Sequence, residues 1–474
     1  MYLCIRGLHT DGKNYIGEAL KKGAVAILLS ENETEPPLPE GIFLLRHRDV
    51  RVAYARLMHA WFGYPSRKLH LIAVTGTNGK TSVTHMLRAI LENALFRCGL
   101  IGTVGCESGG HRLEAASPDP LANLTTPDPP QLYRTLSEMV RDGTDYVIME
   151  ASSHALALGK LEPLTFDAAV FTNLTPEHLD FHKTMEAYAA AKATLFEKSR
   201  LSVINADSPY AGIMLEHASG RCVTCGIQKK NADYRAEEIE LLAEQGVRYL
   251  IRSASRNLRL YCPIPGEFTV MNSMQAAVTA LELGCTVGSL KEGLSTANPV
   301  RGRMERVRLG LGADFSVLID YAHTPDALEN LLRMSRGLCR EGGRIVLLFG
   351  CGGDRDRGKR AVMGRIASRL ADCVILTSDN SRSEDPMEII AQIRAGMPED
   401  YPVRILPDRR EAIRSAILEA GRNDLILLAG KGHEEYEINR NGRQSFSERA
   451  IVKEAFAERL QAEQRKETGA ESES

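Results

Sequence analysis

Residues 75–82 read TGTNGKTS, and these residue types at this spacing are suited to binding phosphate. An apolar run at 71–74 comes before them, and apolar residues recur at helical spacing after them, at 83, 86, 87, 90 and 91. This pattern predicts a buried strand that leads through a turn into a helix. Backbone amides at the start of such a helix converge beside the Lys80 ammonium, and together they attract an anion.

We therefore predict that this turn binds the phosphates of ATP, with Lys80 on the outer phosphates and the Thr81 hydroxyl on a Mg²⁺ ion. Val74 stands where the usual phosphate-binding loop has its first glycine, so the match is to a shorter variant. A glycine-rich turn that only caps a helix is the alternative. The strand, the Lys-Thr pair and the helix together favour phosphate binding. The predicted nucleotide contacts here are Gly76, Thr77, Asn78, Gly79, Lys80, Thr81 and Ser82.

Two further apolar runs, at 146–149 and 168–171, are each followed by polar residues. Glu150 directly follows the first run, and His178 lies in the polar segment after the second run. Because ligands collect at the carboxyl ends of strands in open α/β sheets, we expect both side chains to hold a cation near the nucleotide. A single Glu or His after a strand is more often a surface or capping residue. Their repeated placement favours the cation site.

Lys192 lies in the segment AYAAAKATLF, where small residues surround a long cationic side chain. Small neighbours let another backbone approach closely, so Lys192 can point into the interior, with a lowered pKa and a reactive amine. A lysine that faces solvent is the alternative, and the segment taken alone favours it.

Five apolar runs alternate with amphipathic helices in the last third of the chain, at 316–319, 345–349, 374–376, 403–406 and 425–428. Such spacing predicts βαβ units and a mainly parallel sheet. Polar residues follow nearly every run, which predicts a second binding surface. Arg355 and Arg382 offer planar forks for carboxylate, and Glu434 offers an anion for ammonium, so this surface suits an amino acid.

The whole chain has 474 residues, which suggests about three domains. Its 43% hydrophobic and 25% charged residues are typical of soluble globular proteins, and a net charge of -2 gives no indication of nucleic-acid binding. We find no membrane span or signal peptide and expect a cytoplasmic monomer.

Cys222 and Cys225 form a CxxC pair without a partner pair, so we expect reduced thiols. Trp61 is expected to serve packing.

A nucleotide site and an amino-acid site in one chain indicate an ATP-dependent amide ligase. A carboxylate of another substrate takes the γ-phosphoryl group, and the amine captures the acyl phosphate. Lys80 and magnesium offset the negative charge that otherwise keeps carboxylate and phosphate apart.

Nine segments, in the family's order, resemble the Mur ligases. They are VTGTNGKTS, TTPD, EASSHAL, NLTPEHLDFH, AAAKATLF, GRMERV, DYAHTPDAL, GCGGDRDRGKR and AGKGHEEYE. The resemblance implies an α/β protein of three domains: 1–66 for the UDP end of a substrate, a central P-loop-type ATPase at 67–297 and a Rossmann-like domain at 298–474. The Asp-Ser-Arg segment expected upstream is absent, so we expect either an earlier start or weakened UDP binding.

The resemblance also implies roles for particular residues. Carbamylated Lys192 would hold magnesium with Thr81, Glu150 and His178. Further nucleotide contacts would be Asn272, Arg303 and Asp320. Contacts to the muramoyl peptide would be Thr125, Thr126, Ser152 and Lys160. The pocket for the added amino acid would comprise Arg355, Asp379, Asn380, Ser381, Arg382, Gly430 and Glu434.

The implied reaction adds meso-diaminopimelate to UDP-N-acetylmuramoyl-L-alanyl-D-glutamate in peptidoglycan biosynthesis. Residues 379–382 read Asp-Asn-Ser-Arg and resemble the family's Asp-Asn-Pro-Arg, whose arginine matches the far carboxylate of diaminopimelate. Ser381 replaces proline and is expected to free the turn. Leu158, Lys160 and Thr269 also depart from the family's pattern. The alternatives are a lysine-adding ligase, a folylpolyglutamate synthetase-like ligase and a non-catalytic nucleotide-binding partner protein.

Overall fold

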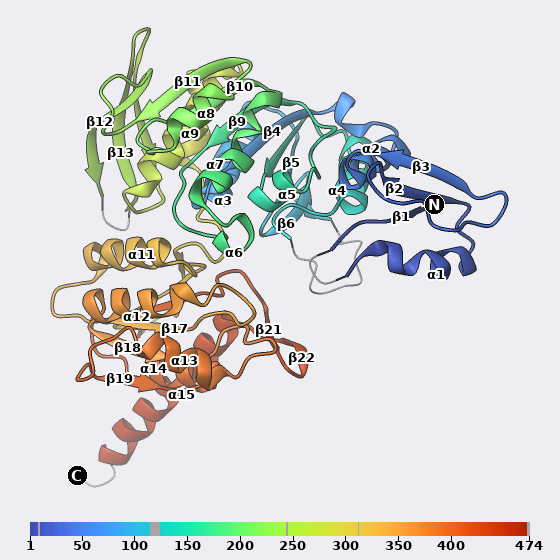
Figure 1. Cartoon of the computed structure of the whole chain (residues 1–474). Coiled ribbons are helices and arrows are strands. Elements are labelled where there is room, and N and C mark those ends of the chain that lie inside the picture. The colour runs from blue at the N-terminus through green and yellow to red at the C-terminus, as the bar shows by residue number, and fades with distance from the viewer. Residues whose placement is uncertain (8–9, 114–123, 243–244, 311, 472–474) are drawn as a thin grey trace. The chain divides into compact units, whose positions relative to one another are not determined.

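The computed structural model describes residues 1–7, 10–113, 124–242, 245–310 and 312–471. Figure 1 shows their elements, and the chain divides into two compact units. The first unit comprises Met1–Leu174, Glu186–Arg235 and Met274–Gly293. The second comprises Thr175–Met185, Ala236–Ser273 and Leu294–Ser474. Four of the five boundaries between the units fall inside a helix or a strand.

The first unit begins with a small parallel sheet of strand order β1-β2-β3. Its strands are β1 (Tyr2–Leu3), β2 (Ala26–Ser30) and β3 (Phe43–His47), and its helices are α1 (Ile16–Lys21) and α2 (Val50–Trp61). Asp49 caps α2 by accepting hydrogen bonds from the amides of Arg51 and Val52, which fixes where that helix starts. Trp61 is 80% exposed at the end of α2, so the prediction that it serves packing is wrong.

The large sheet runs in the order β14-β13-β12-β11-β10-β9-β4-β8-β5-β6-β7, and its strands β13 (Val247–Ser253) and β14 (Asn257–Cys262) belong to the second unit. Its seven strands from β12 to β5 are parallel, whereas β6 and β7 at one end, and β13 with β14 at the other, form antiparallel pairs. The apolar run of β4 is buried on both faces, as the continuous pattern at 71–74 predicted. The strands are β4 (His70–Thr75), β5 (Cys98–Gly102), β6 (Gly105–Ser108), β7 (His111–Arg112), β8 (Tyr146–Glu150), β9 (Phe166–Phe171), β10 (Ser199–Asn205), β11 (Arg221–Gly226) and β12 (Tyr234–Leu241).

Helices follow most strands of this sheet, as a parallel arrangement requires. They are α3 (Lys80–Asn93), α4 (Pro129–Arg141), α5 (Ser153–Ala157), α7 (Met185–Ala193), α8 (Ala211–Glu216), α9 (Phe268–Glu282) and α10 (Val287–Ser295), with the one-turn helices η2 (Pro65–Lys68) and η3 (Phe196–Lys198). A further short helix, η1 (Gly12–Tyr15), precedes α1.

The second unit contains a sheet of order β15-β16-β20-β17-β18-β19, parallel except for β15. It confirms the five strands predicted from the alternating apolar runs. The elements are β15 (Glu305–Arg306), β16 (Ser316–Asp320), α11 (Pro325–Leu338), β17 (Ile345–Phe349), α12 (Gly358–Leu370), β18 (Cys373–Leu376), α13 (Pro386–Arg394), β19 (Val403–Ile405), α14 (Arg409–Leu418), β20 (Leu425–Ala429) and α15 (Glu448–Glu471).

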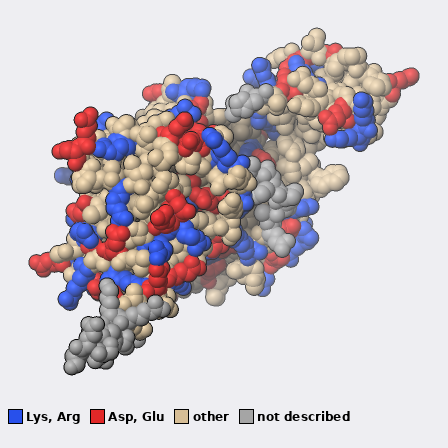
Figure 2. Space-filling model, turned by 90° about the horizontal axis from the view of Figure 1, so that it is seen from below, with Lys and Arg blue, Asp and Glu red and all other residues tan. Residues whose placement is uncertain are grey.

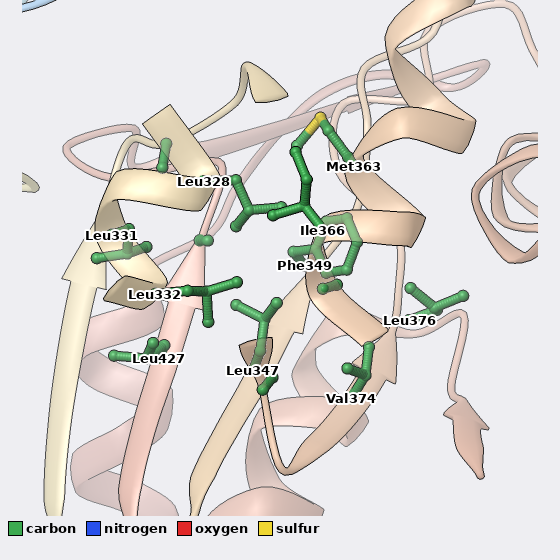
Figure 3. Close-up of a cluster of buried hydrophobic side chains, with 14 of the residues drawn as sticks. Leu328, Leu331, Leu332, Leu347, Phe349, Met363, Ile366, Val374, Leu376 and Leu427 are labelled. Carbon is green, nitrogen blue, oxygen red and sulfur yellow. The ribbon is translucent and has the colours of Figure 1, made fainter. Parts of the chain in front are cut away.

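Apolar side chains fill both faces of this sheet. Figure 3 shows one face, where Leu347 and Phe349 of β17 meet Leu332 of α11 and Met363 of α12. Alternate residues of the same strand, including Leu348, pack on the opposite face against α14 and α15. Truncating a buried aromatic such as Phe349 to alanine would cost about 3–5 kcal/mol of unfolding free energy. This rigid sheet therefore supports the loops at its carboxyl edge.

Several elements of the second unit lie outside this sheet. They are the short helix α6 (Leu179–His182) and the antiparallel pairs β13 (Val247–Ser253) with β14 (Asn257–Cys262) and β21 (Tyr436–Asn439) with β22 (Gly442–Ser445). No helix in the described ranges is long and apolar enough to cross a membrane. On the face seen in Figure 2, cationic and anionic side chains are interspersed.

Candidate active site

The phosphate-binding turn is built as the sequence predicted: β4 ends at Thr75 and α3 begins at Lys80. Gly76 has a φ of +147°, and a Cβ there would lie 1.9 Å from Thr172 Oγ1, so only glycine fits. The turn is tied to the end of β9. Asn78 N donates to Asn173 Oδ1 at 2.9 Å, and Thr172 Oγ1 donates to Asn78 O at 2.6 Å.

Two lysine side chains meet at one carbonyl oxygen of this turn. Lys80 Nζ donates to Gly76 O at 2.9 Å and to Thr77 O at 2.7 Å. Lys192 Nζ donates to the same Gly76 O at 2.9 Å and lies 4.7 Å from the centre of the Tyr188 ring. Lys192 is only 1% exposed, so the interior position is confirmed and the solvent-facing alternative is wrong. Two ammonium groups on one acceptor repel each other at this short range.

The Glu150 carboxylate, 1% exposed, lies beside this turn and accepts hydrogen bonds from two threonines. Thr81 Oγ1 donates to Glu150 Oε1 at 3.0 Å, while Thr103 donates through its amide and its hydroxyl, both at 2.9 Å. The predicted pair Thr81 and Glu150 is therefore brought together. Thr103 was missed, because a single threonine after a strand carries no sequence signal.

His178 belongs to the second unit, directly before α6. Its φ of +56° is left-handed, and its Nε2 lies 3.7 Å from Glu177 Oε2. The role expected for His178 at a cation therefore stays a prediction. The described ranges hold no cluster of three His, Cys, Asp or Glu side chains that could bind a metal, and Cys222 and Cys225 are free thiols.

The residues expected to hold the muramoyl peptide form one hydrogen-bonded group in the first unit. Thr126 Oγ1 donates to Glu150 O at 2.8 Å and accepts from Ser152 N at 3.0 Å. Ser152 also caps α5, and Thr125 Oγ1 lies 3.1 Å from Thr103 Oγ1. This group connects the threonine segment to the carboxyl ends of β5 and β8.

A cavity of about 520 Å³ lies beside this group, within the first unit. The fourth expected contact, Lys160, lines it and pairs with Asp128 at 2.7 Å. Arg51 of α2 and Arg134 of α4 also line the cavity, and sequence reasoning missed both because they lie far apart in the chain. Apolar and aromatic walls come from Ile5, Tyr54, Phe62, Leu124 and Leu158. The cavity can therefore take a ligand with anionic and flat apolar parts.

The further nucleotide contacts expected from the resemblance lie in the second unit. Asp320 at the end of β16 accepts hydrogen bonds from Met304 N at 2.7 Å and Ala322 N at 2.8 Å, and burial raises the pKa of its carboxyl. The Arg303 guanidinium lies 4.7 Å from the centre of the Tyr321 ring. Buried Asn272 lies in α9. Their contact with a nucleotide stays a prediction.

The predicted amino-acid surface is centred on Asn380, which follows β18. Its Oδ1 accepts from Lys431 Nζ at 2.9 Å and from Ile438 N at 3.0 Å, so its amide nitrogen faces the other way. That nitrogen donates to Glu434 Oε2 at 2.7 Å. Lys431 is fully buried and was missed, since its role depends on partners distant in sequence.

Two carboxyl groups of this surface, the buried Asp379 and the partly buried Glu434, have opposite pKa shifts. Burial raises the pKa of Asp379, but the charges of Lys431 and Arg409 outweigh it and hold that pKa below its usual value. Burial and the negative charge of Asp379 raise the pKa of Glu434. Gly430 has a φ of +112°, and a Cβ there would lie 2.5 Å from Asp379 Oδ2, so this position requires glycine.

Arg382 is held in a left-handed conformation with a φ of +51°. Its Nη1 donates to Gly353 O at 2.8 Å and to Asn380 O at 3.3 Å. Within the described ranges its side-chain hydrogen bonds come from Nη1 alone, which leaves the Nη2 and Nε edge for a carboxylate. The turn at Ser381 is held by two backbone hydrogen bonds, from Glu384 N to Ser381 O and from Arg382 N to Ile438 O, each at 3.0 Å, and the freedom expected from serine in place of proline stays a prediction.

Arg355 lies in the loop after β17 and is exposed. Its Nη1 donates to Asp354 O at 3.0 Å, and partial desolvation by its neighbours together with the positive charge of Arg382 lowers the pKa of its guanidinium. The second unit therefore brings together all seven residues predicted for the amino acid: they lie on the loops after β17, β18 and β20.

Comparison with known proteins gives family matches over most of this chain. Residues 74–280 match the Mur ligase middle domain, and residues 302–432 match the Mur ligase, glutamate ligase domain. A protein of Caldanaerobacter subterraneus named UDP-N-acetylmuramoyl-L-alanyl-D-glutamate--2,6-diaminopimelate ligase is 44% identical over 97% of this chain and 92% of its own length. One from Geobacillus thermodenitrificans with the same name is 39% identical over the same shares.

Solved structures agree in fold. A structure of a UDP-N-acetylmuramoyl-L-alanyl-D-glutamate--2,6-diaminopimelate ligase has a TM-score of 0.64 and 31% identity, covering 95% of this chain and 90% of its own. A folylpolyglutamate synthase of Mycobacterium tuberculosis has a TM-score of 0.65 at 17% identity, covering 86% and 95%, which shows a shared fold alone.

The fold, the phosphate-binding turn and the matched domains define an ATP-dependent amide ligase of α/β structure. The predicted enzyme class and fold class are both confirmed. The chain belongs to the Mur ligase family.

Proposed function

We propose that this protein joins meso-diaminopimelate to UDP-N-acetylmuramoyl-L-alanyl-D-glutamate, with hydrolysis of ATP to ADP and phosphate, in peptidoglycan biosynthesis. The single observation that carries the choice of amino acid is Arg382. Its Nη1 is anchored on Gly353 O, which leaves its Nη2 and Nε edge for a carboxylate, and Asn380 beside it donates to Glu434. This edge pairs with a second carboxylate, which diaminopimelate has and lysine lacks. The names of the curated relatives support the same choice.

The reaction proceeds in two steps that balance. A carboxylate oxygen of the D-glutamate residue bonds to the γ-phosphorus of ATP while the bond from that phosphorus to the bridging oxygen breaks, and ADP leaves. The free amine of diaminopimelate then bonds to the acyl carbon, inorganic phosphate leaves, and the nitrogen loses a proton. Glu434 and Asn380 are suited to orient the ammonium end of the amino acid, and Arg382 its far carboxylate.

The phosphates of ATP bind at the turn formed by residues 76–82, at the N-terminus of α3. Lys80 lies within reach of the outer phosphates because its ammonium is already folded back over the turn. We assign Asn272, Arg303 and Asp320 to further parts of the nucleotide.

Thr81 and Glu150 present hard oxygen donors side by side, and this donor set fits Mg²⁺, with His178 and Lys192 as further members of the site. When bound, Mg²⁺ would offset the charge of the phosphates. A carbamate on Lys192 is supported by its position, because an anion in place of one of the two ammonium groups at Gly76 O turns repulsion into attraction.

The muramoyl substrate occupies the first unit. Thr125, Thr126, Ser152 and Lys160 hold its peptide, and the adjoining cavity with Arg51 and Arg134 takes its anionic end. We propose three domains: residues 1–66 bind the UDP end of the substrate, residues 67–297 bind ATP and residues 298–474 bind the amino acid. The enzyme is proposed to be cytoplasmic, since ATP is its cosubstrate, and to be a monomer.

The decisive experiment measures ADP formation by the purified protein with the muramoyl dipeptide and diaminopimelate, L-lysine or L-glutamate, and identifies the product by mass spectrometry. We expect turnover with diaminopimelate and a mass gain equal to that amino acid less water. Preference for lysine or glutamate would favour the alternative ligases, and ATP binding without any product would favour a nucleotide-binding partner protein. The Lys80→Ala variant provides the background rate.

A further inference from the structure

A buried carboxylate, Glu384, joins two loops at the carboxyl edge of the C-terminal sheet. It lies in the loop after β18, and its Oε1 accepts from Asp354 N of the loop after β17 at 2.6 Å. Both of its oxygens pair with the fork of Arg360, each at 2.9 Å. Glu384 is 8% exposed and Arg360 is fully buried. The Arg360 fork holds the pKa of Glu384 down to about 2, so the pair stays charged at neutral pH.

Arg360 extends this connection into the helices below the loops. It lies in α12 and also donates to Gly352 O at 3.1 Å and to Gln392 Oε1 of α13 at 2.8 Å. Arg357 Nη2 lies 3.2 Å from Glu384 Oε2. We call Glu384 and these partners the Glu384 network. It fixes both loops to the rigid part of the sheet.

The Glu384 network leads directly to the group that holds Arg382. Gly353, whose carbonyl accepts from Arg382 Nη1, is the residue before Asp354 and donates its amide to Asn380 O at 2.9 Å. Ser383, the residue after Arg382, donates its hydroxyl to Asp354 Oδ1 at 2.6 Å. A left-handed φ is unfavourable for an L-residue such as arginine, so surrounding contacts must maintain it.

We propose that Glu384 and Arg360 are positioning residues that set the direction of the Arg382 guanidinium and thereby the selectivity for an amino acid with a second carboxylate. This inference rests on the proposed function, and neither residue touches the substrate. Without the network, Gly353 O and the left-handed turn lose their support. The Nη2 and Nε edge of Arg382 then no longer points steadily at one place.

The chain offers a matched control at the opposite edge of the same sheet. Asp424 precedes β20, is also buried, and accepts from Arg344 Nη2 at 2.7 Å and from the amides of Arg344 and Gly421 at 2.9 and 2.8 Å. Glu384→Gln and Asp424→Asn therefore each neutralise a buried carboxylate that pairs with an arginine, by an isosteric change, although the Arg344 side chain is half-exposed and that of Arg360 is buried. Only the first lies beside Arg382.

Kinetics of the two variants separate positioning from general weakening. We expect Glu384→Gln to raise KM for diaminopimelate about tenfold, the size of losing one charge-assisted hydrogen bond to the substrate, while KM for ATP changes less than about twofold. Asp424→Asn should leave both constants near those of the wild type. An unchanged KM for diaminopimelate in Glu384→Gln, or an equal rise for both substrates, would overturn the inference. Ser383→Ala, at an exposed site, should give a smaller change in the same direction even if Glu384→Gln fails to fold.

A second measurement needs no substrate. Phenylglyoxal reacts with accessible guanidinium groups, and peptide mass spectrometry gives its rate at Arg382. The rate should rise in Glu384→Gln and in Ser383→Ala but not in Asp424→Asn, and equal rates in all variants would contradict the positioning role. If the wild type shows no turnover with diaminopimelate, the proposed function fails, while the labelling rates still decide whether the network holds Arg382.

Discussion

Replacing Lys431 with methionine should destabilise the protein in a pH-dependent way. The change keeps most of the side chain's volume but removes the ammonium that donates to Asn380 Oδ1 and to Tyr436 O, both at 2.9 Å. It also removes the largest of the charges that keep Asp379 ionised. Because a buried anion loses its partner, we expect a loss of about 3–5 kcal/mol in unfolding free energy near neutral pH.

The sign of the pH dependence follows from the two carboxyl groups. In the wild type the pKa of Asp379 lies below its usual 3.8, so its stabilising contribution is present above pH 3.8 and is lost below it. Without Lys431 burial dominates, so the pKa of Asp379 rises, and that of Glu434, already raised by burial, rises further. The destabilisation by Lys431→Met should therefore grow as pH rises through the new pKa values.

Urea denaturation followed by circular dichroism, at about pH 5 and about pH 8, measures this difference. The control is Lys453→Met on the exposed side of α15. A loss that is equal at both pH values, or no larger than that of the control, would refute the role assigned to Lys431. Lys431→Met should also raise KM for diaminopimelate, because the Asn380 amide loses one of the two donors that orient it.

Three other variants test the remaining assignments. Lys80→Ala should abolish ADP formation and weaken ATP binding in calorimetry, and retained turnover would remove the phosphate-binding assignment. Lys192→Ala should be inactive but partly restored by a short carboxylate at high concentration, whereas wild-type rates would end the carbamate proposal. Arg382→Ala should raise KM for diaminopimelate at least about tenfold, with KM for ATP unchanged. The distant Arg336→Ala serves as its control, and a uniform effect on both substrates would count against selectivity.

The sequence predicted those parts of the fold whose residues are buried on both faces. The run at 345–349 became β17 with the same bounds, because a central parallel strand needs apolar residues at every position. In contrast, β3 (Phe43–His47) was missed, since its side chains are only partly buried and show no regular alternation. The pair β21 and β22 was missed for the same reason.

The candidate site was predictable where the chemistry is local in the chain. Glycines, a lysine and a threonine within eight residues predicted the turn that contains Lys80, and its geometry is confirmed. Lys431 and Glu384 could not be predicted, because their partners Asn380 and Arg360 come from other loops and helices. Lys192 was ambiguous, since small neighbours allow a buried side chain but do not require one.

The position of the only tryptophan gives the molecule a built-in optical reporter. Trp61 is solvent-exposed at the end of α2, and its neighbour Phe62 lines the cavity assigned to the muramoyl substrate. Its emission should resemble that of free indole in water and be quenched readily by acrylamide. Since Trp61 itself does not line the cavity, we expect a ligand there to change this signal only through Phe62, and ATP added alone should leave it nearly unchanged.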